Sequence, residues 1–250
     1  MARVVAPEDL DTLDARDPAA VHARRDLRRI HRAMGTRSIL VRGLADLRSA
    51  RPGRRLHILE LGAGDGTLML GVARTLARTG CAAQLTLLDR QPCVEAATLD
   101  GYVRAGWDAA PVVTDVARWV VVENARVQPI GAAPARWDLI IASLFLHHFN
   151  WRELVALLEA IARRTERFFA CEPRRAGLAL AASHLVGALG ANAVTRNDSV
   201  ASVRAGFAGT ELSALWPAPR GDWELHEYGA GLFSHCLSAR RRGRRDADRV

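Results

Sequence analysis

A carboxylate and three alternately spaced glycines follow the first strongly apolar run of the chain. The segment reads Glu60-Leu61-Gly62-Ala63-Gly64-Asp65-Gly66 and leads into a helical pattern. Glycines let the backbone turn tightly and approach a ligand, and the start of a helix offers free N–H groups and the positive end of the helix dipole. The segment therefore predicts a binding site for an anionic or carboxylate-bearing ligand.

Two other ligand classes use glycine turns of this kind. A phosphate-binding P-loop needs Gly-Lys-Ser/Thr, and the chain contains no lysine. The same absence excludes Schiff-base and pyridoxal chemistry. A nicotinamide-dinucleotide turn needs a third glycine three positions after the second, where this chain has Thr67. The sequence thus departs from both patterns.

The turn resembles the first motif of the class I S-adenosylmethionine (SAM)-dependent methyltransferase superfamily, in which an acidic residue precedes glycines spaced G-x-G-x-G. Three further segments fall where that superfamily contacts its cofactor. Asp89 ends the second predicted strand, Asp115-Val116 follows the third, and Ser143-Leu144-Phe145 follows the fourth. The resemblance is clear over about residues 56–172.

This resemblance implies SAM as the cofactor and gives roles to individual residues. The Asp89 carboxylate would accept hydrogen bonds from the ribose hydroxyls. Asp115 with Val116 would hold the adenine amino group, and Ser143 would belong to the floor of the site. Acids at strand ends are also common helix caps. The predicted cofactor-binding residues are Glu60, Gly62, Ala63, Gly64, Asp65, Gly66, Asp89, Arg90, Asp115, Val116, Ser143 and Leu144.

A closer resemblance lies after the fifth predicted strand. Glu172-Pro173-Arg174-Arg175, Val200–Phe207 and Glu211-Leu212 look like a bacterial group of small methyltransferases that tailor natural products, phenols or quinones. In that group, helices after the fifth strand cover the acceptor pocket. The resemblance implies methyl transfer to O or C of a small aromatic or polyketide-like acceptor, or alternatively C-methylation of a quinone precursor.

Nucleic-acid methylation is a weaker alternative. Enzymes that methylate base amines typically carry Asp/Asn-Pro-Pro-Tyr/Phe after the fourth strand, whereas this chain reads Ala142-Ser143-Leu144-Phe145-Leu146-His147-His148-Phe149. The formal charge of +8 is not strong support either. Residues 239–250 contain six Arg and two Asp, a net charge of +4, so half of the excess lies in the terminal tail.

Two adjacent histidines, His147 and His148, are the general-base candidates. Imidazole titrates near neutral pH and can take a proton from a phenol. Such histidines can also simply pack below the cofactor or cap the next helix. We predict no metal site, because consecutive side chains diverge and no third ligand is evident. The acceptor-binding candidates are His31, Phe145, Arg174, Arg175 and Arg204.

Short apolar runs alternate with longer helical stretches from residue 56 onward, which favours a doubly wound α/β fold. We predict a mostly parallel seven-stranded sheet with an antiparallel last strand, as in the Rossmann-like methyltransferase fold. Asn150 and Glu153 predict a capping box at one helix start. The predicted strands are Leu56–Leu61, Gln84–Leu88, Pro111–Thr114, Trp137–Ala142, Phe168–Cys171 and a hairpin of Trp223–Tyr228 and Leu232–Ala239 joined by Gly229–Gly231; predicted helices include Gly66–Thr79 and Gln91–Val103.

Three parts make up the predicted organisation. Residues 1–50 form a helical segment that either packs against the domain or covers a small-molecule pocket as a lid. Residues 51–240 form the SAM-binding domain with an acceptor-pocket insert at 174–220, and residues 241–250 form a disordered basic tail.

The composition favours a cytoplasmic protein, and the resemblance implies a small-molecule acceptor as its partner. Nowhere do eighteen consecutive apolar residues occur, and the first ten residues lack an apolar signal region. The four cysteines are widely spaced and form no C-x-x-C pair, so we expect reduced thiols. The sequence leaves open whether the protein is a monomer or a homodimer.

Overall fold

The computed structural model describes residues 1–45, 47, 54–124, 136–217 and 220–242. Seven strands form one sheet in the order β3-β2-β1-β4-β5-β7-β6. Strands β1 to β5 are parallel, and β7 pairs antiparallel with both β5 and β6. The fold class predicted from the sequence is therefore confirmed. The strands are β1 (Leu56–Leu61), β2 (Ala83–Asp89), β3 (Asp108–Val113), β4 (Leu139–Ser143), β5 (Arg167–Pro173), β6 (Trp223–Ala230) and β7 (Ser234–Arg241).

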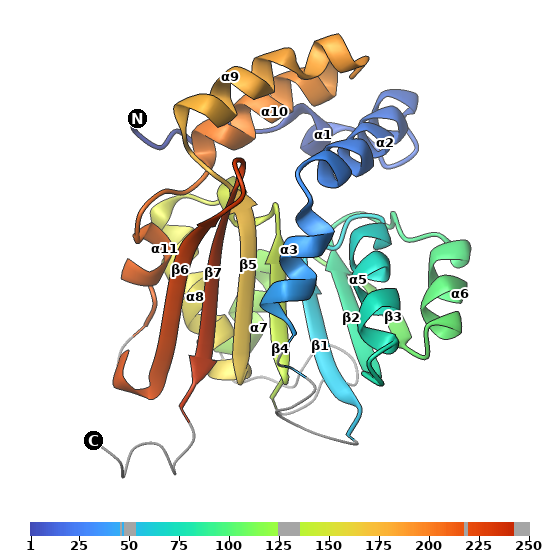
Figure 1. Cartoon of the computed structure of the whole chain (residues 1–250), viewed down its shortest axis with the longest axis vertical. Helices are drawn as coiled ribbons and strands as arrows, with labels where there is room; N and C mark the ends of the chain where they lie inside the picture. The colour runs from blue at the N-terminus through green and yellow to red at the C-terminus, as the bar shows by residue number, and fades with distance from the viewer. Residues whose placement is uncertain (46, 48–53, 125–135, 218–219, 243–250) are drawn as a thin grey trace.

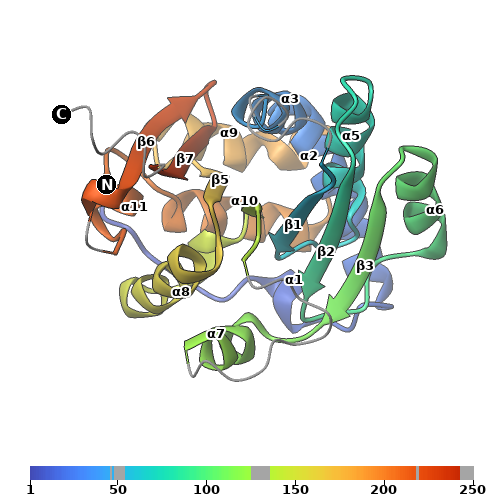
Figure 2. The ribbon, with the colours of Figure 1, turned by 90° about the horizontal axis from the view of Figure 1, so that it is seen from below.

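Helices cover both faces of the sheet and one of its ends. Helices α3, α5 and α6 lie on one face, and α7, α8 and α11 lie on the other (Figure 2). Helices α1, α2, α9 and α10 lie together beyond the carboxyl ends of the parallel strands (Figure 1). The helices are α1 (Asp9–Thr12), α2 (Pro18–Ala33), α3 (Thr36–Gly43), α5 (Thr67–Ala77), α6 (Ala96–Arg104), α7 (Val116–Asn124), α8 (Trp151–Arg164), α9 (Gly177–Leu185), α10 (Ala193–Ala205) and α11 (Glu211–Ala214), with short 3-10 turns η1 (Leu146–His148), η2 (Val186–Leu189) and η3 (Arg220–Asp222).

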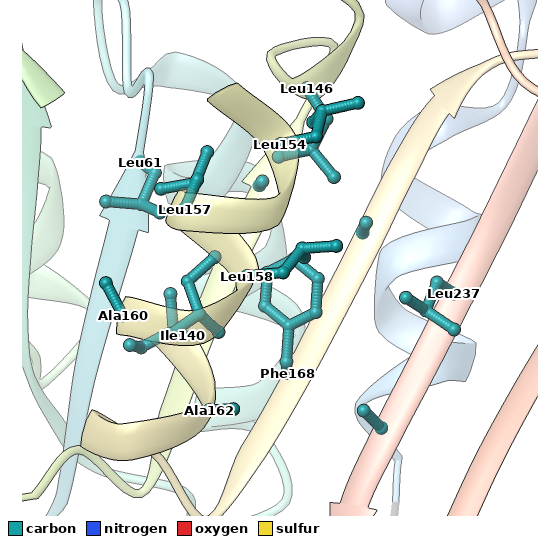
Figure 3. Close-up of a cluster of buried hydrophobic side chains, with 14 of the residues drawn as sticks. Leu61, Ile140, Leu146, Leu154, Leu157, Leu158, Ala160, Ala162, Phe168 and Leu237 are labelled. Atoms are coloured by element: carbon teal, nitrogen blue, oxygen red, sulfur yellow. The ribbon is translucent and has the colours of Figure 1, made fainter. Parts of the chain in front are cut away.

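Helix α8 shows how the sequence builds one of these layers. The side chain of Asn150 accepts from the N–H of Glu153 at 3.0 Å, and the carboxylate of Glu153 accepts from the N–H of Asn150 at 2.8 Å. The predicted capping box is thus present. The apolar stripe of the helix then packs on side chains of β1, β4 and β5 (Figure 3), which include Leu61, Ile140 and Phe168. This packing fixes the end of β4, where the chain turns towards the candidate site.

The N-terminal helices pack in two different places. Helix α3 packs beside the sheet, where Gly43 lies so close to Phe169 that a Cβ would meet its ring at 2.3 Å. Helices α1 and α2 instead lie against α10 at the carboxyl end of the sheet. No helix in the described ranges is both long and apolar enough to cross a membrane.

Several predicted boundaries need correction, among them those of β3, which begins at Asp108 and not at Pro111, and of β4, which begins at Leu139 and not at Trp137. The hairpin exists, but Gly229 and Ala230 belong to β6 and the turn falls on residues 231–233, since Ala230 pairs with Ser234. Helix α6 begins at Ala96 and not at Gln91, because residues 91–95 form an irregular approach to it. Strand β7 continues through Arg241, whose guanidinium lies 4.5 Å from the centre of the Trp223 ring. Residues 243–250 of the predicted tail lie outside the described residues.

Candidate cofactor and acceptor site

The glycine turn joins β1 to α5 in a conformation that few other residues adopt. Gly62, Gly64 and Gly66 have φ angles of 68°, 55° and 71°. A Cβ at Gly62 would also lie 2.2 Å from the ring of Phe145, whereas one at Gly64 would meet nothing within 4 Å. The turn therefore needs glycine for its backbone, and at Gly64 that backbone is open to a ligand.

Asp89 holds this turn from the end of the neighbouring strand. Its Oδ2 accepts a hydrogen bond from the N–H of Gly64 at 2.8 Å, and its Oδ1 accepts one from the N–H of Gln91 at 2.9 Å. A carboxylate has about four acceptor positions, so two remain for other donors. The structure brings Asp89 to the glycine turn, as the sequence predicted.

Glu60 is a buried acid at the carboxyl end of β1. Its side chain has an Oε2 atom without a hydrogen-bond partner among the described residues. Burial raises the pKa of Glu60 well above its usual range, and the nearby carboxylates of Asp89 and Asp65 raise it further. The buried hydroxyl of Ser143, at the end of the adjacent strand β4, also has no hydrogen-bond partner among the described residues. Unpaired buried polar atoms are uncommon and point to a missing donor or acceptor at this edge.

The chain leaves β4 through a strained residue. Leu144 has a φ of 51°, and no other non-glycine residue of the described chain has a positive φ. Bulky side chains rarely adopt this conformation, and such residues cluster at functional sites. The N–H of Leu144 donates to the carbonyl of Cys171 at 2.9 Å, which keeps the strained residue attached to β5. The next residue, Phe145, reaches the glycine turn.

Glu172 fixes the turn η1 that follows. Its carboxylate, which is fully buried, accepts from the N–H groups of Phe145 at 3.1 Å, Leu146 at 3.0 Å and His147 at 3.4 Å. It also lies 2.9 Å from Nδ1 of His147. In the sequence Glu172 contributes only to a family resemblance, but in the structure it organises the loop beside the glycine turn.

His147 lies between two carboxylates. Nδ1 faces Glu172, and Nε2 lies 3.2 Å from Oε1 of Glu8, with the side chain only 3% exposed. Burial lowers the pKa of His147, but the hydrogen bonds and charges of Glu172 and Glu8 outweigh it and raise the pKa to about 9. A protonated ring with both nitrogens engaged has no free lone pair. This arrangement favours a positioning role for His147 over a general-base role.

His148 is more accessible and lies beside His147. The two ring centroids are 4.3 Å apart, so the expectation that these side chains diverge is wrong. Nδ1 of His148 lies 3.1 Å from Oδ2 of Asp11, and Nε2 lies 4.0 Å from Oε2 of Glu8. Glu8 and Asp11 come from the N-terminal segment, and no local pattern in the sequence could have placed them here.

Arg3 ties the N-terminal segment (residues 1–33) to η1. Its guanidinium donates to the carbonyls of His147 at 3.2 Å, Phe149 at 2.9 Å and Ala205 at 2.7 Å. It also lies 4.5 Å from the centre of the Trp151 ring. The N-terminal segment therefore makes ionic and hydrogen-bonded contacts with η1 and with α10 at once.

Two further ion pairs join the N-terminal segment to the glycine turn and to the residue that follows β2. Arg28 of α2 pairs with Asp65 of the glycine turn at 2.6 Å, and Arg90 pairs with Asp11 at 3.0 Å. Arg90, which the sequence predicts to bind the cofactor, thus also contacts the N-terminal segment. Asp65 also accepts from the N–H of Thr67 at 3.0 Å.

His31 of α2 lies near the glycine turn, as the sequence suggested. Its Nδ1 is buried and has no hydrogen-bond partner within the described ranges. Burial lowers the pKa of His31 to about 4, and the charge of Asp65 opposes this only in part. The ring is therefore neutral at neutral pH and can donate or accept a hydrogen bond.

The remaining predicted residues divide into structural and exposed ones. Arg175 pairs with Glu211 and donates to the carbonyls of Met1 and Gly206, so its guanidinium is engaged within the fold. Asp115 caps α7 by accepting from the N–H of Ala117 at 2.7 Å, and Val116 packs in the core. Arg174 and Arg204 are exposed. These placements lend no support to direct ligand roles for Arg175 or Val116.

Comparisons with known proteins define the fold. No family model and no curated protein matches the sequence. Among solved structures, the plantazolicin methyltransferase BpumL in complex with S-adenosylhomocysteine (SAH) matches with a TM-score of 0.62 at 13% identity, over 91% of this chain and 92% of that one. Magnesium protoporphyrin IX methyltransferase from Synechocystis PCC 6803 with bound SAH matches with a TM-score of 0.50 at 14% identity, over 87% and 86%.

The pyocyanin biosynthetic protein PhzM also matches, with a TM-score of 0.52 at 16% identity, over 91% of this chain and 60% of that one. These likenesses extend along nearly the whole chain. They show that its fold is that of the class I SAM-dependent methyltransferases, which confirms the fold that the sequence resemblance implied.

Proposed function

We propose that this chain is a SAM-dependent methyltransferase that acts on a small-molecule acceptor. The observation that carries the proposal is the unpaired buried oxygen of Glu60 next to an open, positive-φ glycine turn that Asp89 holds. The proteins of the same fold that were crystallised with SAH support the choice of cofactor.

The residues at this edge fit the chemical groups of SAM. The methionine ammonium would supply the donor that Oε2 of Glu60 lacks, and the ribose hydroxyls would use the free acceptor positions of Asp89. The hydroxyl of Ser143 offers a further unpaired polar atom. When bound, SAM supplies an electrophilic methyl group on a positively charged sulfur. The protein's own task is then to align the acceptor in line with that methyl group and to exclude water.

The proposed acceptor is a small aromatic or polyketide-like molecule, methylated on O or C. The aromatic rings of Phe145 and Phe149 meet edge to face beside the glycine turn, with centroids 5.0 Å apart. The N-terminal segment and α10 cover the same edge, which suits an acceptor that is enclosed during transfer. C-methylation of a quinone precursor is the alternative within this class. BpumL was crystallised with a pentazolic desmethylPZN analog, and the Synechocystis enzyme is named for magnesium protoporphyrin IX.

A phenolic acceptor must lose a proton during transfer. Since both nitrogens of His147 are engaged, His148 is the remaining general-base candidate of the predicted pair. Replacing His148 by Ala should then lower the turnover of a phenolic acceptor and change the shape of its pH profile. An unchanged pH profile would remove His148 from this role.

Isothermal calorimetry with SAH tests the cofactor assignment. The wild-type chain should bind SAH at micromolar-scale affinity and should not bind NADH. Gly64→Arg should abolish SAH binding, because the side chain would occupy the open side of the turn. Gly106→Arg is the matched control, since Gly106 also has a positive φ and nothing near its Cβ position but lies at the far end of α6. Binding of NADH in place of SAH would refute the assignment.

A second assay separates an enzyme from a protein that only binds the cofactor. Incubation with SAM and a panel of phenols, quinols and polyketide-like aromatics should release SAH with at least one acceptor. SAH binding without SAH formation across such a panel would favour a cofactor-binding interaction protein.

A further inference from the structure

Three side chains from distant parts of the chain converge beside η1. Glu8, His147 and His148 each offer one ligand atom, and the three atoms lie within 4.8 Å of one another. Oε1 of Glu8 is 3.2 Å from Nε2 of His147, and Oε2 of Glu8 is 4.0 Å from Nε2 of His148. Both imidazoles therefore present the same nitrogen to one carboxylate.

The other nitrogen of each ring is also held by a carboxylate. Nδ1 of His147 lies 2.9 Å from Oε2 of Glu172, and Nδ1 of His148 lies 3.1 Å from Oδ2 of Asp11. Histidines that bind metals almost always donate their second N–H to a carboxylate, carbonyl or water, which fixes the ring orientation and makes the ligating nitrogen more basic. This cluster shows that arrangement twice.

We propose that Glu8, His147 and His148 bind one divalent transition-metal ion of the zinc type. Two imidazoles and one carboxylate are ligands that suit such ions and do not suit magnesium or calcium. Three protein ligands leave a coordination position for water or for an oxygen of the acceptor. The ion would connect the N-terminal segment to η1 and so hold the cover on the site.

The spacing suits this ion with a small adjustment. Metal–ligand bonds of about 2.0–2.1 Å in tetrahedral geometry separate neighbouring ligand atoms by roughly 3.3 Å. Oε1 of Glu8 lies 3.2 Å from Nε2 of His147, close to that value, and the other oxygen, Oε2, lies 4.0 Å from Nε2 of His148. His148 is 22% exposed, and a change in its side-chain torsions would close the longer contact. A bound ion would take the place of the ring protons on Nε2.

Metal binding at this cluster does not depend on the cofactor, but it excludes a general-base role for His148. A metal on Nε2 of His148 leaves that ring no lone pair, so His148 cannot then be the general base. Without a metal, the cluster is only a hydrogen-bonded contact between the N-terminal segment and η1. Failure of metal binding would leave the proposed SAM-binding residues untouched, because Glu60, Asp89 and Ser143 are not among the metal ligands.

Cobalt binding to the full chain tests the proposal. After treatment with EDTA and its removal, titration with CoCl2 should give visible absorption bands that saturate at one ion per chain and disappear when ZnCl2 is added. His148→Gln and Glu8→Gln should each lower the affinity by more than about 100-fold. Asp11→Asn changes a residue that orients His148 but is not itself a ligand, so it should lower the affinity by about 10-fold.

Exposed histidines can also bind metals weakly, so a control is needed. His184→Gln, which changes an exposed histidine on α9, should bind cobalt as the wild type does. Thermal melts of the EDTA-treated variants check that each one is folded. The proposal is overturned if the wild type shows no saturable site, or if His148→Gln and Glu8→Gln keep the wild-type spectrum and affinity.

Discussion

Two regions meet at the carboxyl end of the sheet, and they are built in different ways. The donor region is the name we give to residues 60–89, where we propose that the methyl donor binds. It depends on backbone conformation within one strand–turn–helix–strand unit. The cover region, where Glu8 and Arg3 contact η1, depends on charged contacts between segments about 140 residues apart. The donor region is therefore a local property of the sequence, and the cover is a property of the whole fold. We expect cofactor affinity and the stability of the cover to respond to different substitutions.

Replacement of Glu172 by Ala should have the largest effect on stability. It removes the acceptor of three backbone N–H groups and leaves the His147 ring with one carboxylate in a buried site. Breaking such a buried pair costs about 3–5 kcal/mol. Urea unfolding should show this loss, and Glu172→Gln, which keeps one acceptor oxygen, should lose less.

Asp89→Ala is the matching test in the donor region. Asp89, like Glu172, accepts hydrogen bonds from backbone N–H groups, two in its case, but it is less buried than Glu172. Its cost in stability should be only about 1–3 kcal/mol, while SAH affinity falls sharply. If Asp89→Ala binds SAH as tightly as the wild type, the donor region is assigned wrongly.

Gly62→Ala should destabilise the donor region through sterics alone. The substitution places a Cβ against the Phe145 ring and a non-glycine residue at a φ of 68°. Overpacking costs about 1–3 kcal/mol in addition to about 1 kcal/mol or more for the left-handed backbone. Gly106→Ala carries only the backbone cost, since its Cβ would meet nothing within 4 Å. Equal urea midpoints for the two variants would contradict the close approach of Phe145.

Arg3→Ala should loosen the cover and spare the donor region. It removes three hydrogen bonds to backbone carbonyls and a stacking contact with Trp151. We expect a loss of about 1–3 kcal/mol and faster hydrogen exchange in residues 1–33. SAH affinity should change little. Exchange that increases equally in β1 and α5 would mean that the two regions are not separable.

Arg28→Ala should have the smallest effect, although it cuts an ion pair that directly joins the two regions. Arg28 is 45% exposed and Asp65 is 19% exposed, so solvent screens the pair. Such pairs contribute at most about 1 kcal/mol. If urea unfolding shows that the free energy of unfolding falls by more than that value, Arg28 has a further role in the cover.

The same division explains what could be predicted from the sequence. The strand, glycine turn and helix from Leu56 to Ala77 follow from local periodicity and glycine spacing, and the structure confirms them. The capping box of Asn150 was equally predictable, because its two partners are three residues apart. In each case the interaction that decides the conformation lies within a few residues of sequence.

The cover could not be predicted in this way. Nothing near Glu8 in the sequence indicates that it contacts His147, and only the packing of the N-terminal segment against α10 brings the two together. The expectation that His147 and His148 diverge failed for a related reason. It holds for a regular strand, whereas this pair lies in a 3-10 turn that Glu172 shapes from β5.

The central claim is that the buried carboxyl of Glu60 receives the ammonium of the cofactor. Burial raises the pKa of Glu60 and so favours the protonated carboxyl in the free chain, whereas a bound cation would lower that pKa and favour release of the proton. Calorimetric titration of SAH in two buffers of different ionisation enthalpy measures this release. For the wild type, we predict binding heats that differ between the two buffers, because the buffer takes up the released proton, and an affinity that rises with pH. For Glu60→Gln, we predict equal heats in the two buffers. Equal heats in both buffers for the wild type, or no SAH binding at all, would contradict the claim.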